Sequence, residues 1–260
     1  MENAIKLREK LNRGKTCVGC AVSFSDPTVS EALSEVLDFV WIEAEHSPLT
    51  IESIQGHIMA TKGSDAAPLV RVPWNDPVLI KPVLDAGAAG IVAPMVCNAE
   101  EARRLVAACL YPPEGIRGFG PRRPSNYGQS MNPEFCKAAN AAIIPIAQIE
   151  HINAVNNIEE ILDVPGIFAI LMGPFDLAGS MGHSGDPGHP EVQQAVDTVI
   201  AAACRKKIFV GMGVTDDPRS CELLIKKGVN WICIPPDYML MLRSAKQFVA
   251  AIQGFSDALK

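Results

Sequence analysis

Four short apolar segments of the sequence are each followed by side chains that can do chemistry. In chain order these side chains are Glu43, Glu45, His46, Arg71, Gln148, Glu150 and Asp176. Each is weakly informative alone, because an acidic residue after a strand is ordinarily a helix cap or part of a solvated turn. Gathered on one rim, carboxylates, an imidazole and a guanidinium would form an oxygen-rich cation site with an acid–base group and an anion-binding group beside it.

Glu150 and Asp176 are the candidate metal ligands. Mg²⁺ and Mn²⁺ commonly take one or two protein carboxylates and fill their other octahedral positions with water and substrate oxygens. A zinc site would be expected to recruit His or Cys directly, and no second His follows another at a helical spacing of three or four. His151, next to Glu150, is interpreted as a helix-start residue. We therefore expect Mg²⁺ or Mn²⁺, with Co²⁺ as a further candidate.

The apolar pattern supplies a scaffold that would bring these residues together. Short β-branched runs alternate with segments of helical period, which indicates parallel strands joined by crossover helices. Strands are predicted over residues 16–23, 38–43, 68–72, 90–94, 143–149, 167–172, 208–212 and 231–234. Helices are predicted over 27–37, 51–61, 77–86, 99–110, 132–142, 153–162, 190–206, 218–227 and 237–259. This alternation predicts one α/β domain over residues 1–260, a (β/α)8 TIM barrel, with an open doubly wound sheet as the alternative.

Barrel enzymes build their sites at the C-terminal ends of the strands, which is where the reactive side chains fall. Two long Gly- and Pro-rich stretches, 111–131 and 178–190, are predicted to be functional loops near that rim. A phosphate site would need Gly-rich turns after strands seven and eight, but strand eight ends in CIPPD. The Gly-Met-Gly of residues 211–213 is interpreted as close backbone packing, so phosphosugar isomerisation is disfavoured.

Composition favours a small-molecule partner. The formal net charge is −6, and the 23 basic residues are scattered, so the sequence has no basic stripe for nucleic acid or anionic lipid. No long apolar run or signal-like N-terminus is present, and we expect a cytoplasmic protein without membrane contact. The pair Cys17 and Cys20 has redox or zinc spacing, but it lies in an apolar strand and is interpreted as structural.

Several motifs, in order and spacing, resemble those of the HpcH/HpaI family of class II pyruvate aldolases. They are IEAEHSP, VRVPWNDPVLIKPVLDAGAAGIVAPMV, YPPEGIRG, AQIE, GPFDLAGSMG and GDPGHPEV, within about residues 11–250. The resemblance implies a barrel of the phosphoenolpyruvate/pyruvate type in which pyruvate chelates a metal held by Glu150 and Asp176. Arg71 would stabilise the enolate oxygen, Gln148 would lie behind the metal or bind its water, and Gly173 would donate its backbone N–H to the pyruvate carboxylate.

The same resemblance implies a catalyst made of several subunits. His46 resembles the acid–base histidine of the family, which works with an aspartate that matches Asp85. The predicted helix 77–86 carries Asp85 away from the strand ends, where an acid is usually surface charge. In the family this aspartate reaches a neighbouring active site. We therefore expect a homo-oligomer, hexamer or trimer, with an exchanged C-terminal helix.

The sequence departs from the family pattern around the acceptor side of the site. The usual Asp-Gly-Glu-His reads Glu-Ala-Glu-His here, and GPADL reads GPFDL. Pro174 and Phe175 are expected to line the substrate pocket. Arg122 and Tyr127, in the basic and aromatic loop GFGPRRPSNYG, are expected to meet an acceptor aldehyde or a second carboxylate.

The expected reaction is reversible cleavage of a 4-hydroxy-2-oxo acid to pyruvate and an aldehyde. Decarboxylation of oxaloacetate with carbon–carbon bond formation, as in macrophomate synthase, is the nearest alternative. A carbon–phosphorus mutase, a citramalyl-type lyase and a non-catalytic scaffold are more distant. Schiff-base chemistry is disfavoured, because lysines such as Lys81, Lys226 and Lys227 lie at helix ends rather than at strand ends.

Overall fold

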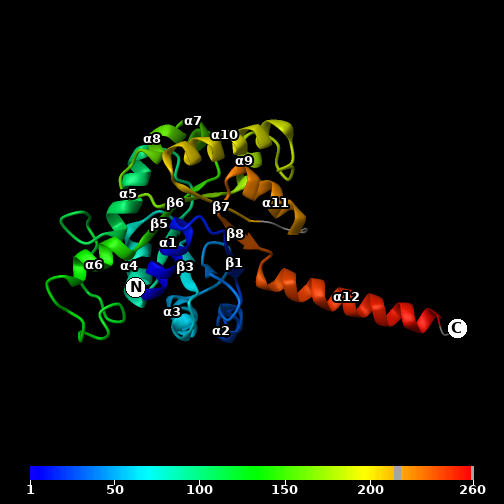
Figure 1. The fold of residues 1–260 in the computed structure, drawn as a ribbon, viewed down its shortest axis with the longest axis horizontal. Helices are drawn as coiled ribbons and strands as arrows, with labels where there is room; N and C mark the ends of the chain where they lie inside the picture. The colour runs from blue at the N-terminus through cyan, green and yellow to red at the C-terminus, as the bar shows by residue number, and fades with distance from the viewer. Residues whose placement is uncertain (214–217, 259–260) are drawn as a thin grey trace.

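Eight parallel strands close into a barrel in the computed structural model, with most helices on its outside (Figure 1). The structure describes residues 1–213 and 218–258, and within these ranges it describes side chains as far as residue 255. The strands are β1 Cys17–Val22, β2 Phe39–Glu43, β3 Ala67–Arg71, β4 Gly90–Ala93, β5 Ile144–Ile149, β6 Ala169–Met172, β7 Phe209–Gly213 and β8 Trp231–Ile234. The predicted (β/α)8 barrel is confirmed, and every predicted strand boundary lies within two residues of the observed one.

The helices follow the predicted alternation with a few differences. They are α1 Glu2–Asn12, α2 Thr28–Ser34, α3 Ile51–Ala60, α4 Pro77–Ala86, α5 Ala99–Cys109, α6 Phe135–Ala142, α7 Ile152–Asn156, α8 Ile158–Leu162, α9 Pro174–Ser180, α10 Pro190–Lys206, α11 Pro218–Lys227 and α12 Asp237–Ala258, with a 3₁₀ turn η1 Thr61–Gly63. Helices α1 and α9 were not predicted. The single helix expected over 153–162 is wrong, because α7 and α8 part at Asn157, whose Nδ2 donates to the carbonyl of Cys97 at 2.9 Å. The predicted helix end at 259 lies outside the described residues.

Helix α1 covers the N-terminal end of the barrel. Asn3 Nδ2 donates to the carbonyl of Ala66 at 2.6 Å, and Arg8 Nη1 donates to the carbonyl of Ile143 at 2.9 Å. These carbonyls directly precede β3 and β5. The apolar face of α1, including Leu7, packs into the cluster that fills the barrel interior. A site is therefore left to the opposite, C-terminal rim.

Two glycines let large aromatic rings fill the barrel. Phe39 and Trp231 are buried, and their ring centroids lie 5.5 Å apart in an edge-on arrangement. A Cβ on Gly19 would lie 2.2 Å from the Phe39 ring, and a Cβ on Gly211 would lie 2.1 Å from the Trp231 ring. Close packing is thus confirmed for Gly211, whereas Gly213 faces open space.

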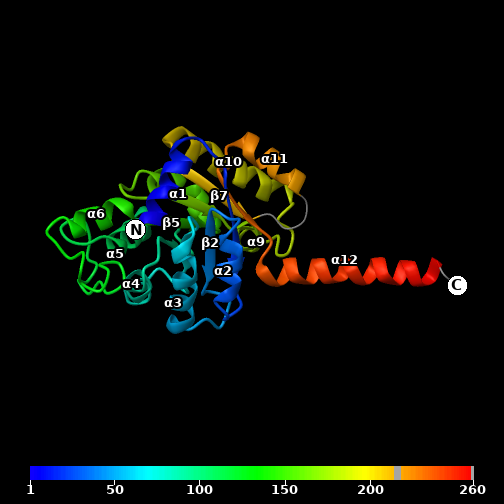
Figure 2. The ribbon, with the colours of Figure 1, turned by 60° about the horizontal axis from the view of Figure 1, so that its bottom comes forward.

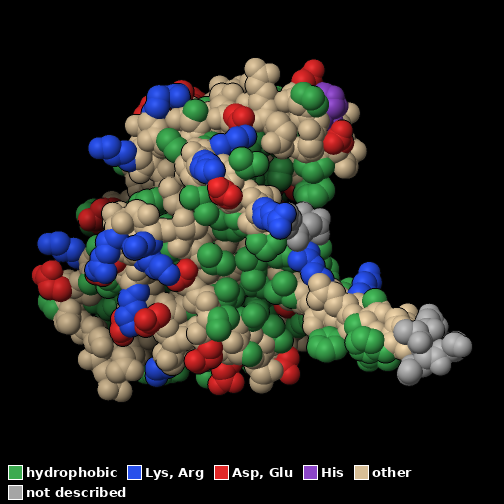
Figure 3. All heavy atoms as spheres, turned by 45° about the vertical axis from the view of Figure 1, so that its right-hand side comes forward, with side chains coloured by type: hydrophobic (Ala, Val, Ile, Leu, Met, Phe, Trp, Pro, Cys, Tyr) green, Lys and Arg blue, Asp and Glu red, His purple; other side chains and the backbone are tan. Residues whose placement is uncertain are grey.

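Helix α12 projects away from the barrel in both ribbon views (Figures 1 and 2). Its exposed large hydrophobic side chains are Tyr238, Met241, Leu242, Phe248, Val249, Ile252 and Phe255. Hydrophobic side chains also gather on the face of the molecule beside the start of α12 (Figure 3). None of the described helices is both long enough and apolar enough to cross a membrane.

The cysteine spacing that resembled a redox or zinc motif has a structural role. Cys17 and Cys20 are both buried and unpaired. Burial raises the pKa of each thiol to about 12, so neither supplies a thiolate near neutral pH. The interpretation of these residues as part of the core is therefore confirmed.

The contact between Gly211 and Trp231 gives a stability prediction. Gly211→Ala should lower the free energy of unfolding by about 1–3 kcal/mol or more, because the new methyl group must displace a packed indole or the strand itself. Urea unfolding followed by tryptophan fluorescence measures the change. Gly213→Ala is the matched control on the same strand and should cost far less; equal losses for the two variants would contradict this packing argument.

Candidate active site

Arg71 lies at the centre of the polar residues on the C-terminal rim. The register of β2 and β3 pairs it with Glu43. One oxygen of Glu43, Oε2, contacts two nitrogens of Arg71. Arg71 Nε donates to it at 2.7 Å, and Arg71 Nη2 lies 2.6 Å from it. Its Nη1 donates to Gln148 Oε1 at 3.4 Å, and its Cζ lies 5.0 Å from the centroid of the Trp41 ring. A carboxylate and an aromatic ring from β2 and an amide from β5 therefore fix the guanidinium.

Glu43 also shapes the turn that leaves β2. Its Oε1 accepts the backbone N–H groups of Glu45 at 2.8 Å and His46 at 3.0 Å. The hydroxyl of Ser47 donates to the carbonyl of Glu43. One buried carboxylate thus holds Arg71 with one oxygen and the start of the His46 turn with the other.

Glu45 is a second, poorly compensated carboxylate beside Arg71. Its Oε2 lies 3.1 Å from Arg71 Nε and 3.6 Å from His46 Nε2. This oxygen is buried and has no aligned hydrogen-bond partner among the described residues. Burial raises the pKa of the Glu45 carboxyl above its ordinary value, and the charge of Arg71 opposes that rise. His46 itself is 65 % exposed at the mouth of the site.

Glu150 follows β5 and is almost completely buried. Its Oε1 accepts the N–H of Met95 at 2.8 Å, and its Oε2 accepts from Gln148 Nε2. Burial is the main cause that raises the pKa of the Glu150 carboxyl, and the charge of Asp176 adds to it; the two hydrogen bonds act in the opposite direction. Gln148 therefore links the two ends of the site, accepting from Arg71 and donating to Glu150.

Asp176 stands in the first turn of α9 and is exposed. It lines two neighbouring hollows. One, of about 490 Å³, contains Glu150 and the loop residues Ser184 and Gly185. The other, of about 340 Å³, contains Arg71 together with His46, Gln148, Gly173, Pro174 and Phe175. Most of the predicted site residues therefore meet around Asp176.

Glu150 and Asp176 are the residues at this rim that could hold a hard divalent cation. They line one hollow, and within the described residues neither carboxylate lies within 4 Å of a Lys, Arg or His nitrogen. Gly173 keeps this region open, because a Cβ there would lie 2.8 Å from Glu150 Oε2. Carboxylate oxygens without a protein cation are the ligands that Mg²⁺ and Mn²⁺ prefer.

The backbone of Gly173 differs from the expected arrangement. Its N–H donates to the carbonyl of Ile149 at 3.0 Å, so it is already used between β5 and β6. The expectation that this N–H faces a substrate carboxylate is not met in this structure. The first N–H groups of a helix have no partner within the helix, so those of Phe175 and Asp176 in α9 are better placed to receive an anion.

Three predicted residues do not join this site within one chain. Asp85 lies on α4, where its carboxylate accepts from Arg117 Nη2 at 2.9 Å. Arg122 and Tyr127 are exposed on the 111–131 connection, and neither lines the two hollows. The role of Asp85 in a neighbouring subunit stays a prediction.

Sequence reasoning missed the contribution of Met95. It follows β4 with a φ of 54°, an uncommon backbone conformation for a residue with a side chain, and this turn aims its N–H at Glu150. The letters APMVCN carry no signal for it, because the contact depends on backbone direction. His151 was interpreted correctly, since its Nδ1 accepts from the N–H of Asn153 at the start of α7.

Comparisons with known proteins agree with this geometry. The sequence pattern of the HpcH/HpaI aldolase/citrate lyase family matches residues 21–243. The chain is 35 % identical to the 4-hydroxy-2-oxo-heptane-1,7-dioate aldolase of Salmonella paratyphi C, over 96 % of this chain and 94 % of that protein. It is 34 % identical to the hydroxypyruvate/pyruvate aldolase of Roseobacter denitrificans, over 94 % of this chain and 95 % of that protein.

A solved structure shares the fold of this chain. The structure of macrophomate synthase superposes with a TM-score of 0.88 and 27 % identity, over 99 % of this chain and 91 % of that chain. The resemblance drawn from the sequence motifs is therefore confirmed.

The buried carboxylate of Glu45 predicts how the stability of the fold depends on pH. Its raised pKa means that the folded state holds the proton more tightly than the unfolded state, so its ionisation destabilises the fold as pH rises above the ordinary Glu value. Glu45→Gln should therefore raise the melting temperature at pH 8, and the gain should vanish below about pH 4.5. Thermal unfolding across this range is the measurement. Glu52→Gln removes the same charge from the exposed first turn of α3, where a carboxylate is favourable, and should not raise the melting temperature. An unchanged melting temperature for Glu45→Gln at pH 8 would refute the argument.

Proposed function

The chain belongs to the HpcH/HpaI aldolase/citrate lyase family and is a carbon–carbon lyase, and from this premise we propose its reaction. It cleaves a 4-hydroxy-2-oxo acid reversibly to pyruvate and an aldehyde with a divalent metal ion, Mg²⁺ or Mn²⁺. All eight cysteines are unpaired, which supports the cytoplasm as its compartment.

The single observation that carries the proposal is the carboxylate pair of Glu150 and Asp176, which line one hollow without a Lys, Arg or His ion pair among the described residues. Glu150 is 3 % exposed, and burial together with the charge of Asp176 raises its pKa. An ionised carboxylate away from water is costly unless a cation offsets it. A divalent ion held by these two residues would act as a Lewis acid on the keto oxygen of the substrate.

Arg71 and Gln148 supply the fixed polar groups beside that pair. An enolate forms only if its new negative charge is stabilised where it develops. Arg71 is already held by Glu43 and Trp41, so it faces the substrate without reorganising. Gln148 connects Arg71 to Glu150 and keeps their spacing constant.

His46 moves the proton in this proposal. Cleavage removes the proton of the C4 hydroxyl, breaks the C3–C4 bond with its electron pair left on C3, and then protonates C3 to give pyruvate. His46 stands at the mouth of the hollow that contains Arg71, and Glu45 lies 3.6 Å from its Nε2. It can therefore pass this proton to water.

The walls of the same hollow determine the acceptor aldehyde. Beyond Arg71 they are largely apolar, and they include Trp41, Leu171, Phe175 and Tyr238. Apolar walls favour an aldehyde with an apolar or aromatic substituent over one with a second carboxylate. Phe175 is the residue in GPFDL that departs from the family pattern, so it is the main candidate for this selectivity.

Removal of a metal ligand tests the proposed reaction. Asp176→Asn should lower kcat/KM for pyruvate release by roughly 10³-fold or more, because several kcal/mol of charge stabilisation are lost. Mn²⁺ at about 100 times its Kd should stabilise the wild type by about 2.7 kcal/mol, and this gain should disappear in the variant. Coupled pyruvate assays and thermal melting measure the two effects.

Asp163→Asn is the matched control, because Asp163 pairs with Lys206 before β6, at the other end of the barrel. It should retain full activity and the full Mn²⁺ stabilisation. Wild-type activity that survives EDTA would overturn the metal-dependent reaction.

We further propose that the chain works as a homo-oligomer that exchanges α12. The helix projects from the barrel, and its apolar residues Phe248, Ile252 and Phe255 are 62–70 % exposed. Apolar side chains on a surface of this kind normally contact another protein surface. Exchange between copies would cover both this helix and the barrel face beside it, and it would allow Asp85 to serve a neighbouring site.

Charges on α12 test the oligomer. Phe248→Glu with Ile252→Glu should shift the mass measured by light scattering from an oligomer to a monomer, because an interface does not tolerate unpaired charges. Gln247→Glu with Gln253→Glu adds the same charge to the same helix and should leave the mass unchanged. A wild type that is monomeric at micromolar concentration would disprove the exchange.

A further inference from the structure

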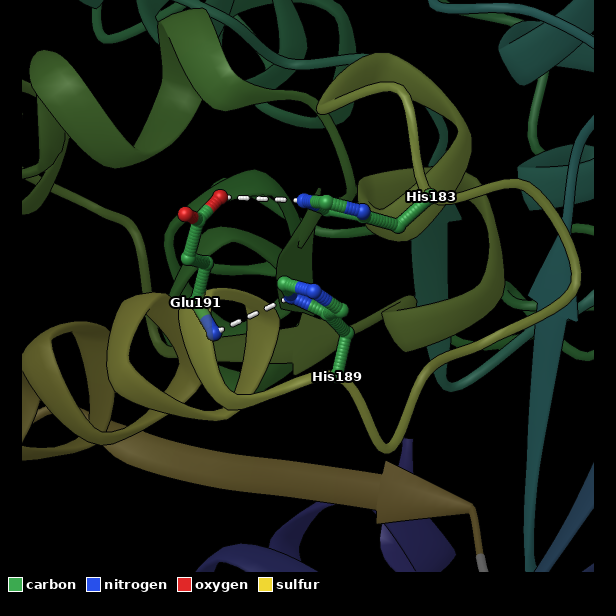
Figure 4. A group of neighbouring side chains, drawn as sticks. All are labelled: His183, His189 and Glu191. Carbon is green, nitrogen blue, oxygen red and sulfur yellow. Dashed lines mark hydrogen bonds and ion pairs between the residues drawn. The ribbon is translucent and has the colours of Figure 1, made fainter.

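Two histidines and a glutamate meet outside the site described above, at the connection between α9 and α10. His183 and His189 lie in this connection, and Glu191 lies in the first turn of α10. Figure 4 shows the two imidazole rings stacked, with the Glu191 carboxylate directed at His183 and the ring of His189 beside the backbone nitrogen of Glu191. Among the described residues they are the one group of three such side chains whose ligand atoms all lie within 4.8 Å of one another.

The contacts inside this group are close. His183 Nε2 lies 3.0 Å from Glu191 Oε2. The two imidazole rings are stacked, with centroids 3.5 Å apart and planes 14° from parallel. His189 Nδ1 accepts the N–H of Glu191 at 3.3 Å, a long hydrogen bond. One ring nitrogen of each histidine and one carboxylate oxygen lie within 4.8 Å of one another, and the stacked rings would turn apart to direct these atoms at a single ion.

Hydrogen bonds to the backbone order the connection that carries His183 and His189. The N–H of His183 donates to the carbonyl of Ala178 at 2.8 Å. The N–H of Asp186 donates to His183, and the N–H of His189 donates to Asp186. The side chain of Gln193 donates to the carbonyl of Pro187 at 2.8 Å. A connection whose backbone is already ordered loses little entropy when its side chains bind an ion.

We propose that His183, His189 and Glu191 form a second cation site, which binds a transition metal ion of the zinc class. Two imidazole nitrogens and one carboxylate oxygen are a ligand set that holds Zn²⁺ with a water in the fourth position. The donor type separates this site from the pair Glu150 and Asp176, whose oxygen ligands suit Mg²⁺ or Mn²⁺.

Helix capping alone does not account for this group. His189 caps α10, but Asn, Asp or Ser would cap at least as well. His183 caps nothing, and its ring stacks on His189 and contacts Glu191 instead. Capping by His189 does not explain His183, whereas a metal site uses all three side chains.

An ion in this second site would stabilise a wall of the active-site region. Ser184 and Gly185 directly follow His183, and they line the hollow that contains Glu150 and Asp176. Joining His183 to the first turn of α10 fixes both ends of the connection that carries them. The second ion is therefore structural, and it acts on the mobility of the wall rather than on the reacting atoms.

Zn²⁺ titration of the full chain by calorimetry, with Zn²⁺ per chain measured after dialysis, tests the site. The double variant Glu150→Gln, Asp176→Asn should still bind one Zn²⁺ per chain. Adding His183→Gln and His189→Asn should abolish that binding, and Asn at position 189 keeps a helix cap. In the wild-type background, the two histidine substitutions should remove one ion and leave Mn²⁺ stabilisation intact. Binding should weaken on acidification, because protons compete for the imidazole nitrogens.

His151→Asn is the matched control, because it replaces another histidine that caps a helix, α7. In the Glu150→Gln, Asp176→Asn background it should leave the Zn²⁺ bound. Unchanged Zn²⁺ stoichiometry after the substitutions at 183 and 189 would overturn the second site. That result would leave the proposed reaction untouched, because pyruvate release is tested separately through Asp176.

Discussion

An imbalance of charge at the C-terminal rim governs the site. Arg71 is the one Lys or Arg among the described residues that line the two hollows around Asp176, yet four carboxylates gather there, from Glu43, Glu45, Glu150 and Asp176. Glu43 holds the guanidinium most closely, and the charge of Arg71 offsets only part of the effect of burial on Glu45 and Glu150. The raised pKa values of Glu45 and Glu150 express the same surplus. Such a site is costly for the folded state when empty, and it is suited to a cation for that reason.

The barrel sustains this cost because its strands fix the carboxylates in place. The parallel register puts Glu43 beside Arg71, and β5 carries Gln148, with Glu150 directly after its last residue. The interior below is filled by Phe39, Trp231 and the aliphatic residues around them. A rigid, close-packed interior prevents the repelling groups from moving apart. Stability is thus concentrated at the covered end of the barrel, and reactivity at the open end.

The sequence predicted the features that follow from the pattern of apolar residues. It did not predict the contacts that depend on the direction of backbone N–H groups. Strand boundaries follow from the apolar runs of the sequence. Arg71 and Glu150 were found because each stands where such a run ends. The role of Met95 could not be read from its side chain, since only its N–H takes part. The N–H of Gly173 was predicted to donate to the substrate, but in the structure it donates to the carbonyl of Ile149. Its glycine is explained by the nearness of Glu150 instead.

The features that one chain leaves unused lie away from its own site. Asp85 pairs with the buried Arg117, which stacks on Tyr111 with its Cζ 4.4 Å from the ring centroid. Burying the guanidinium of Arg117 to pair with one carboxylate has a high desolvation cost, which an ordinary surface carboxylate does not require. The arrangement is easier to understand if Asp85 must be presented at a fixed position to something outside the chain. The same argument applies to helix α12, because its exposed apolar side chains would be covered by a second surface. Both features are accounted for together if copies of the chain meet, so that each barrel lends an acid and a helix to another.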